Sequence, residues 1–177
     1  MRLKRFWARI VFSSVVLISA LFLFGYQSKA AANNVFGNMA YLTSYPDFNN
    51  KVTLVDGAYA WNNGRFFYNL YFGGHYVRGD FNRDGLRDAA VIISEGEGGS
   101  GDFRALAFLI NDGRRLVHRA SHYLGDRAII NSLRNRGGKV VIDMFVHQKQ
   151  DCMAGPTKRV KKVYDYLKPD PDNLLSR

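Results

Sequence analysis

A mainly β fold is the structure that this 177-residue sequence predicts. Short runs alternate apolar with polar residues, and Asp-Gly, Asn-Asp-Gly and Gly-Gly turns separate them. After the N-terminal segment, no long stretch repeats apolar residues at the 3.6-residue period of a helix. We therefore expect an antiparallel meander that forms a partly open barrel or a sandwich, with at most one short helix after an N-terminal signal helix.

The first expected hairpin joins residues 51–55 to residues 58–61 through Asp56-Gly57, because Asp-Gly between apolar runs favours a tight turn. Residues 65–72 form an aromatic-rich segment. Residues 89–94 are a short, almost wholly apolar run, which is typical of a strand buried on both faces.

Two further hairpins and a closing strand follow. One hairpin joins a strand at 103–110 to a strand at 114–123 through the turn Asn111-Asp112-Gly113. The other joins strands at 128–133 and 139–147 through Arg136-Gly137-Gly138. Residues 159–167 form the last strand, and prolines at 169 and 171 end regular structure. The predicted organisation is a signal peptide at 1–32, one β-rich domain at 33–168 and a frayed tail at 169–177.

The N-terminus has the order of a secretory signal peptide. Basic residues lie between Arg2 and Arg9, residues 10–24 are apolar, and Ala30-Ala31-Ala32 offers a cleavage site. This apolar run is shorter than the roughly 20 residues that span a bilayer. We expect a periplasmic or secreted protein; the alternative is an uncleaved membrane anchor lengthened by residues 6–8. No cysteine stands directly after the apolar run, which disfavours a lipoprotein.

The charge of the expected mature chain is modest. The whole sequence carries a net charge of +10, but five of its 25 basic residues and none of its 15 acidic residues precede Asn33, so the rest carries +5. This value does not indicate nucleic acid as a partner; an unknown protein or envelope polymer is expected instead. The basic cluster at 158–162 alternates with valines, as the solvated face of a strand does. Cys152 is the single cysteine, so an internal disulfide is excluded.

The most specific pattern lies at residues 80–88. Oxygen-bearing side chains occupy loop positions 1, 3, 5 and 9, glycine occupies position 6, and a backbone carbonyl is available at position 7. A hard cation such as Ca²⁺ takes six to eight such oxygen ligands. The predicted metal ligands are Asp80, Asn82, Asp84, Leu86 through its carbonyl, and Asp88.

This loop is not an EF-hand, because position 12 is Val91 instead of a bidentate Glu. It looks like the Asp-x-Asn-x-Asp-Gly-x-x-Asp turn of FG-GAP blades and dockerin-like modules. One copy in a chain of this length cannot build a propeller. The expected cofactor is therefore one structural Ca²⁺, which holds the turn before the strand at 89–94.

The other sequence patterns give weaker evidence about function. Residues 96–101 match G-x-G-x-x-G, but the following residues predict a strand and not the helix that a dinucleotide site needs. Arg78-Gly79-Asp80 spells an integrin-recognition tripeptide, which we interpret as coincidence. His118 and His122 are expected on one strand face, with His147 on another strand, and nothing in the sequence brings the three together. No catalytic residue is predicted.

From Val52 onward the chain resembles a widespread bacterial family of small exported proteins and lipoproteins without an assigned function. The residues that carry the resemblance are 52–57, 79–85 with 88–91, 98–101, 124–127, 138–144 and 151–157. In that family the last motif has adjacent cysteines before Pro-Thr, whereas Ala154 and Gly155 stand there in this chain. The resemblance implies a compact β-rich extracytoplasmic domain and supplies no activity.

These observations favour a non-enzymatic, exported binding or structural module. An envelope hydrolase acting on glycans or other polymers through the acidic residues between Asp80 and Asp102 is the first alternative, and it requires a pair of carboxylates roughly 5–9.5 Å apart. The second alternative is an accessory subunit of a membrane complex, held by an uncleaved N-terminus.

Overall fold

Strands form throughout most of the region that the alternating pattern covers. The computed structural model describes residues 35–43, 50–151 and 155–168, so the predicted signal peptide, the tail and Cys152 lie outside the described residues. In chain order the strands are β1 (Ala40–Leu42), β2 (Lys51–Thr53), β3 (Ala58–Asn62), β4 (Phe67–Gly79), β5 (Asp88–Gly96), β6 (Phe103–Asn111), β7 (Leu116–Asp126), β8 (Ile129–Arg136), β9 (Lys139–Val146) and β10 (Lys158–Tyr164).

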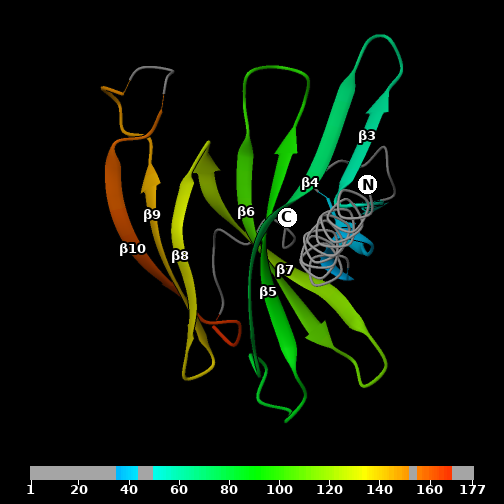
Figure 1. Ribbon diagram of the computed structural model, residues 1–177, viewed down its shortest axis with the longest axis vertical. Helices are drawn as coiled ribbons and strands as arrows, with labels where there is room; N and C mark the ends of the chain where they lie inside the picture. The colour runs from blue at the N-terminus through cyan, green and yellow to red at the C-terminus, as the bar shows by residue number, and fades with distance from the viewer. Residues whose placement is uncertain (1–34, 44–49, 152–154, 169–177) are drawn as a thin grey trace, which may run out of the picture. The chain divides into compact units, whose positions relative to one another are not determined.

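The mainly β prediction is confirmed. All strand pairs are antiparallel, and within the described part of the chain only residues 35–37 are helical. The strands form a five-stranded sheet in the order β3-β4-β5-β6-β7, a three-stranded sheet in the order β10-β9-β8, and the pair β1-β2 (Figure 1). In the described residues, no helix has the length and apolar character needed to cross a membrane.

The five-stranded sheet is covered on both faces, and this explains the apolar run at its centre. Alternate residues of a strand point to opposite faces. In β5, Val91 and Ile93 belong to one buried cluster while Ala90 and Ile92 belong to the other. A strand with one solvent-exposed face would instead alternate apolar with polar residues. The prediction that residues 89–94 form a strand buried on both faces is therefore confirmed.

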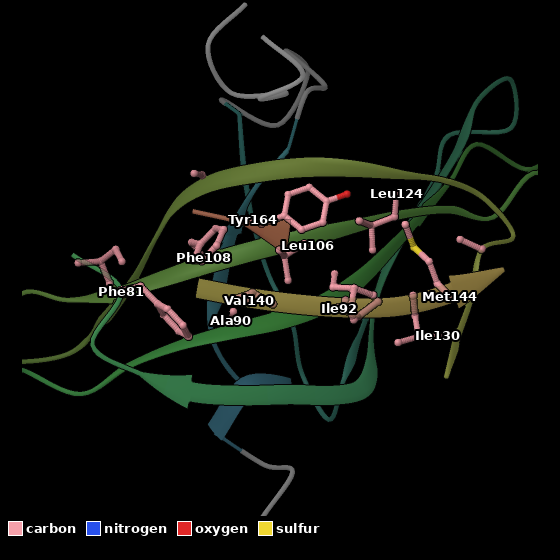
Figure 2. Packing of buried hydrophobic residues seen from close by; sticks show 14 residues of the cluster. Phe81, Ala90, Ile92, Leu106, Phe108, Leu124, Ile130, Val140, Met144 and Tyr164 are labelled. Carbon is pink, nitrogen blue, oxygen red and sulfur yellow. The ribbon is translucent and has the colours of Figure 1, made fainter. Parts of the chain in front are cut away.

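The first cluster lies between the five-stranded and the three-stranded sheets. Leu106 and Phe108 of β6 belong to it together with Val140 and Met144 of β9, and all four side chains are fully buried (Figure 2). The ring of Phe108 also makes an edge contact with Phe81, at 5.4 Å between centroids. We call this layer the first core.

The second cluster covers the opposite face of the same sheet. Tyr41 of β1 and Val52 of β2 pack with Tyr68 of β4 and with Leu109 of β6. Tyr41 is fully buried, and its hydroxyl donates a 2.8 Å hydrogen bond to the carbonyl of Phe36. We call this layer the second core.

The hairpin predicted at Asp56-Gly57 is wrong in its pairing. Both residues have positive φ, 51° and 90°, as a type I′ turn requires, and Val55 and Ala58 form one bridge. However, β2 pairs with β1 and β3 pairs with β4. The turn therefore passes the chain from one sheet to another, because Val52 must reach the second core beside Tyr41.

The other two predicted hairpins and the closing strand are confirmed. β6 and β7 pair around residues 112–115, β8 and β9 pair around Gly137-Gly138, and β10 joins the outer edge of β9.

Candidate functional site

The sequence-predicted metal loop joins β4 to β5, and we call residues 80–88 the aspartate loop. Arg83 and Gly85 both have positive φ, 63° and 85°, so the chain reverses sharply there. Glycine adopts this conformation without strain, which explains its place at position 6. All residues from Arg83 to Arg87 are exposed.

Three of the predicted ligands, Asp80, Asn82 and Asp84, accept hydrogen bonds from backbone amides of their own loop. Asp80 accepts hydrogen bonds from the amides of Asp84 and Gly85, at 3.1 and 3.0 Å. The Asp84 carboxylate accepts from the Leu86 amide at 2.7 Å and from the Asn82 side-chain amide at 2.6 Å. These bonds offset the repulsion between neighbouring carboxylates and keep the loop curled.

Asp88 has a different place from the other predicted ligands. Its side chain is fully buried. One carboxylate oxygen accepts from the Phe81 amide at 2.8 Å and the Asn82 amide at 3.4 Å, and the other accepts from the Asn111 amide at 2.8 Å. Asp88 therefore joins the aspartate loop to the β6–β7 hairpin through backbone groups.

The donor set fits Ca²⁺ in its chemistry, since Asp80, Asn82 and Asp84 supply carboxylate and amide oxygens on an exposed turn. Within residues 35–43, 50–151 and 155–168, no three His, Cys, Asp or Glu side chains converge as a group able to hold a metal ion. Ca²⁺ binding would therefore need the Asn82 amide and the Leu86 carbonyl as well as the carboxylates, and a rotation of the side chains that now face loop amides.

The β8–β9 hairpin packs against the aspartate loop. Asn135 donates to the Arg78 carbonyl at 3.3 Å and accepts from the Gly138 amide at 3.0 Å. A Cβ atom at Gly138 would lie 3.2 Å from the Asp80 carbonyl oxygen. A side chain at this position would therefore crowd the loop, and glycine avoids that contact.

Gly138→Ala should destabilise the protein by about 1–2 kcal/mol, because φ at this position is +76° and the added methyl group crowds Asp80. Gly137→Ala is the matched control, since its φ of +59° is also positive but open space surrounds it. Urea unfolding of both variants measures the difference. Equal losses at the two positions would contradict the proposed fit between hairpin and loop.

A second polar group lies at the opposite end of β5, where the glycine-rich segment leads into β6. We call its members the Asp102 cluster: Tyr71, Asp102, Arg104, Asp126 and Arg127. Asp102 accepts from the Tyr71 hydroxyl at 2.8 Å and pairs with Arg104 at 3.1 Å. Its amide donates to Asp126, which pairs with Arg127 at 2.7 Å.

This cluster joins two segments that the sequence analysis treated separately, namely residues 98–101 with Asp102 and residues 124–127. Partial burial raises the pKa of Asp126, but bonds from Arg127 and from the Asp102 amide outweigh it, so this pKa lies below its ordinary value. Each acid has a basic partner, which leaves the cluster close to neutral. Nothing in the local sequence signals the link between Tyr71 and Asp102, which are 31 residues apart.

The loop after β9 is held by Asp151. Its carboxylate accepts from the amides of Gln148 and Thr157, both at 3.0 Å, and from the Thr157 hydroxyl at 2.5 Å. The Thr157 hydroxyl and these amides lower the pKa of Asp151 to about 2. His147 Nδ1 lies 3.9 Å from the same carboxylate, beyond hydrogen-bond distance.

His118 and His122 do not share a face, contrary to the sequence expectation. Leu109 pairs with His118 and Phe108 with Ala120, so Arg119 is an extra residue in a β-bulge. The bulge turns His118 toward Tyr41 in the second core, while the ring of His122 contacts Phe108 in the first core. His118 and His122 therefore cannot act together as a pair on one face of β7.

His118 is a structural histidine. Its Nδ1 accepts from the Leu42 amide at 2.9 Å, so Nε2 carries the proton and faces the Ser121 hydroxyl at 2.8 Å. Burial lowers the pKa of His118 to about 4, against a hydrogen bond with the Ala120 carbonyl that raises it. The neutral ring ties β1 to β7.

Glu95 lies on the same side of the sheet as the second core. Burial raises the pKa of Glu95 to about 7, and a hydrogen bond with the Tyr68 hydroxyl opposes this shift. The Tyr68 hydroxyl also lies 3.0 Å from the Thr43 hydroxyl, within hydrogen-bond distance. Asp102 instead contacts Tyr71, which points to the opposite face from Tyr68 because the two are an odd number of residues apart.

Together these features define an antiparallel all-β domain with one curled acidic loop and polar groups that tie its strands together. No family model matches the chain, and no curated protein and no solved structure matches it either.

Proposed function

We propose that this chain is an exported, non-enzymatic binding or structural module. The main support for the proposal is that the polar side chains inside the protein hydrogen-bond to its own backbone. Asp88 and His118 receive backbone amide hydrogen bonds from distant segments, and Asp151 receives them from both sides of its own loop, so each holds part of the fold together. An active site would instead direct such groups toward a substrate.

The envelope hydrolase is less well supported. Its acids lie in separate places: Asp80 and Asp84 at one end of β5, Glu95 toward the second core, and Asp102 paired with Arg104. A glycosidase needs two carboxylates that face one substrate.

We also propose that the aspartate loop takes one Ca²⁺ through Asp80, Asn82 and Asp84, with the Leu86 carbonyl. Asp88 would act by fixing the end of the loop. The ion would add positive charge between carboxylates that the loop amides now satisfy. Its expected affinity is that of extracellular modules, about 10⁻⁴–10⁻³ M.

Addition of free Ca²⁺ at about 1 mM should stabilise the protein by about 0.5–1.5 kcal/mol relative to excess chelator, given this affinity. Asp84→Ala should abolish the response. Asp112→Ala, in the exposed turn between β6 and β7, is the matched control and should retain it. Thermal unfolding with and without Ca²⁺ measures the effect. If the wild type ignores both Ca²⁺ and chelator, the loop holds no calcium.

Export rests on the N-terminal sequence. Intact-mass measurement of the protein from its native host tests it directly. A mass that lacks residues 1–32 supports a periplasmic or secreted module. Retention of Met1 to Ala32 would favour the membrane-anchored alternative and an accessory role in a membrane complex.

A further inference from the structure

The outer face of the three-stranded sheet is strongly basic. Directly opposite residues of an antiparallel sheet point to the same side. Because Val140, Ile142 and Met144 are fully buried, their neighbours in β9 point outward. The ladder then gives the outward residues, which we call the basic face: Ile129, Ser132, Arg134, Arg136, Lys139, Val141, Asp143, Phe145, Arg159, Lys161 and Val163.

Five basic residues and one acidic residue stand on the basic face, a net charge of +4. This nearly equals the +5 of the whole expected mature chain. Of the basic residues at 158–162, which the sequence pattern assigned to one strand face, Arg159 and Lys161 lie at one edge of this surface. Lys158 and Lys162 pair with Val146 and Ile142 and therefore point to the other side of the sheet. Nothing in the sequence revealed that Arg134 and Arg136 of β8 lie on the same side.

The single acid of the basic face is already engaged. Arg159 holds Asp143 with two bonds, Nε at 2.9 Å and a terminal nitrogen at 2.6 Å. This contact lowers the pKa of Asp143 to about 2. Lys139 pairs with Asp165 at 3.3 Å. Among the described residues, no acidic side chain lies within ion-pair distance of Arg134, Arg136 or Lys161.

Aliphatic side chains are exposed between these charges. Val163 is 60% exposed and Ile129 is 47% exposed, and they lie on the outer strands at either side of β9. Exposed aliphatic groups gain nothing beside a soluble polyanion. They do gain free energy at the boundary between headgroups and acyl chains, where basic side chains meet anionic headgroups.

We propose that the basic face docks on an anionic lipid membrane surface. This inference rests on the proposed export, because an exported module with this N-terminus meets the outer leaflet of the membrane it has crossed. Lys161 and Arg134 would meet lipid phosphates, and Val163 and Ile129 would enter the headgroup layer. The aspartate loop and the Asp102 cluster lie outside the basic face and take no part.

Vesicle binding tests this proposal with the protein as its host exports it, its N-terminus defined by mass. Binding to vesicles of 30% phosphatidylglycerol in phosphatidylcholine should exceed binding to pure phosphatidylcholine and should fall as salt rises. The double variant Lys161→Glu, Arg134→Glu should lower the vesicle partition coefficient about tenfold or more. Val163→Ser should lower it a few-fold.

Arg114→Glu is the matched control, since it reverses one exposed charge on the β6–β7 hairpin. It should leave binding within about twofold, and far-UV circular dichroism should show all variants folded. Equal losses for Arg114→Glu and the double variant would overturn the proposal, because net charge alone would then explain binding. Full competition by dextran sulfate, with Val163→Ser binding like wild type, would also overturn it and indicate a soluble acidic polymer. Retention of residues 1–32 by mass would contradict the proposed export, whereas vesicle binding that ignores both salt and the double variant would contradict only the docking of the basic face.

Discussion

Asp88→Ala should destabilise the protein by about 3–5 kcal/mol, because three backbone amides lose their acceptor at once. Hydrogen bonds to a charged acceptor contribute about 1.5–3 kcal/mol each, and an unpaired buried donor adds its own desolvation cost. The 3.4 Å bond from Asn82 is weak, so the Phe81 and Asn111 amides account for most of the loss. Urea unfolding at neutral pH measures it.

The variant Asp88→Asn removes the negative charge of the side chain but keeps its shape, so it separates the two effects on stability. The amide keeps one oxygen for Phe81, but its NH₂ group would face the Asn111 amide, so we expect a loss about half as large as that of alanine. Asp84→Ala is the exposed control from the same loop and should cost less than about 1 kcal/mol in chelator. If Asp88→Ala is as mild as Asp84→Ala, the buried carboxylate does not hold the loop to the β6–β7 hairpin.

The role of Asp88 also defines its relation to calcium. If Asp88 acts through backbone amides, its removal should cost the same amount in chelator and in Ca²⁺, apart from the smaller calcium contribution. A loss that appears only in Ca²⁺ would make Asp88 a metal ligand after all, as its spacing in the sequence indicated.

Local patterns predicted those parts of the fold that depend on neighbouring residues. The hairpins at Gly113 and at Gly137-Gly138 combine a turn with alternation on both sides, and both formed as expected. The Asp56-Gly57 turn also formed, but its strands pair elsewhere, because the partner β1 is supplied by a segment before β2. Pairing between distant segments has no local signal.

The candidate sites show the same difference: features set by neighbouring residues were predicted, and those set by distant residues were not. The spacing of the aspartate loop located a curled turn correctly, while the inward direction of Asp88 depended on Asn111, which is 23 residues away. The direction of the His118 side chain depended on a β-bulge at Arg119, and no residue type near this position predicts a bulge. The basic face needed the ladder of three strands before Arg134 and Lys161 could be placed on one side.

Two groups on the second-core side of the sheet, the buried His118 and the half-buried Glu95, should give opposite pH dependences of stability. The pKa of His118 is lowered by burial to about 4, below its unfolded value of 6.5. Between these values the unfolded chain binds more protons, so the stability contributed by neutral His118 is lost as pH falls from 6.5 toward 4. Protonation would also remove the acceptor of the Leu42 amide.

Glu95 acts in the other direction. Burial raises its pKa to about 7, above the unfolded value of 4.5, so the folded chain binds more protons between these values. Its contribution is fully present below pH 4.5 and is lost as pH rises through 7. Asp143 and Asp151, with pKa values of about 2, lose their contribution only below about pH 4 and leave this window unaffected.

Between pH 6.5 and 4.5 each group should change the free energy of unfolding by about 2 kcal/mol, and the two changes should nearly cancel in the wild type. Relative to the wild-type profile, His118→Asn should become about 2 kcal/mol more stable across this fall in pH, because only the Glu95 contribution remains. Glu95→Gln should become about 2 kcal/mol less stable. The two profiles should therefore diverge by about 4 kcal/mol.

Urea unfolding at several pH values measures these slopes, and the slope is the readout because either substitution also shifts stability at every pH. The double variant is the control: with both groups removed, its profile should again run parallel to that of the wild type. Since His118 holds β1 through Leu42 and Glu95 contacts Tyr68 of β4, the groups titrate on separate contacts and their effects should add. Single-variant profiles parallel to the wild type would mean that neither group is buried in the folded protein as the structure places it.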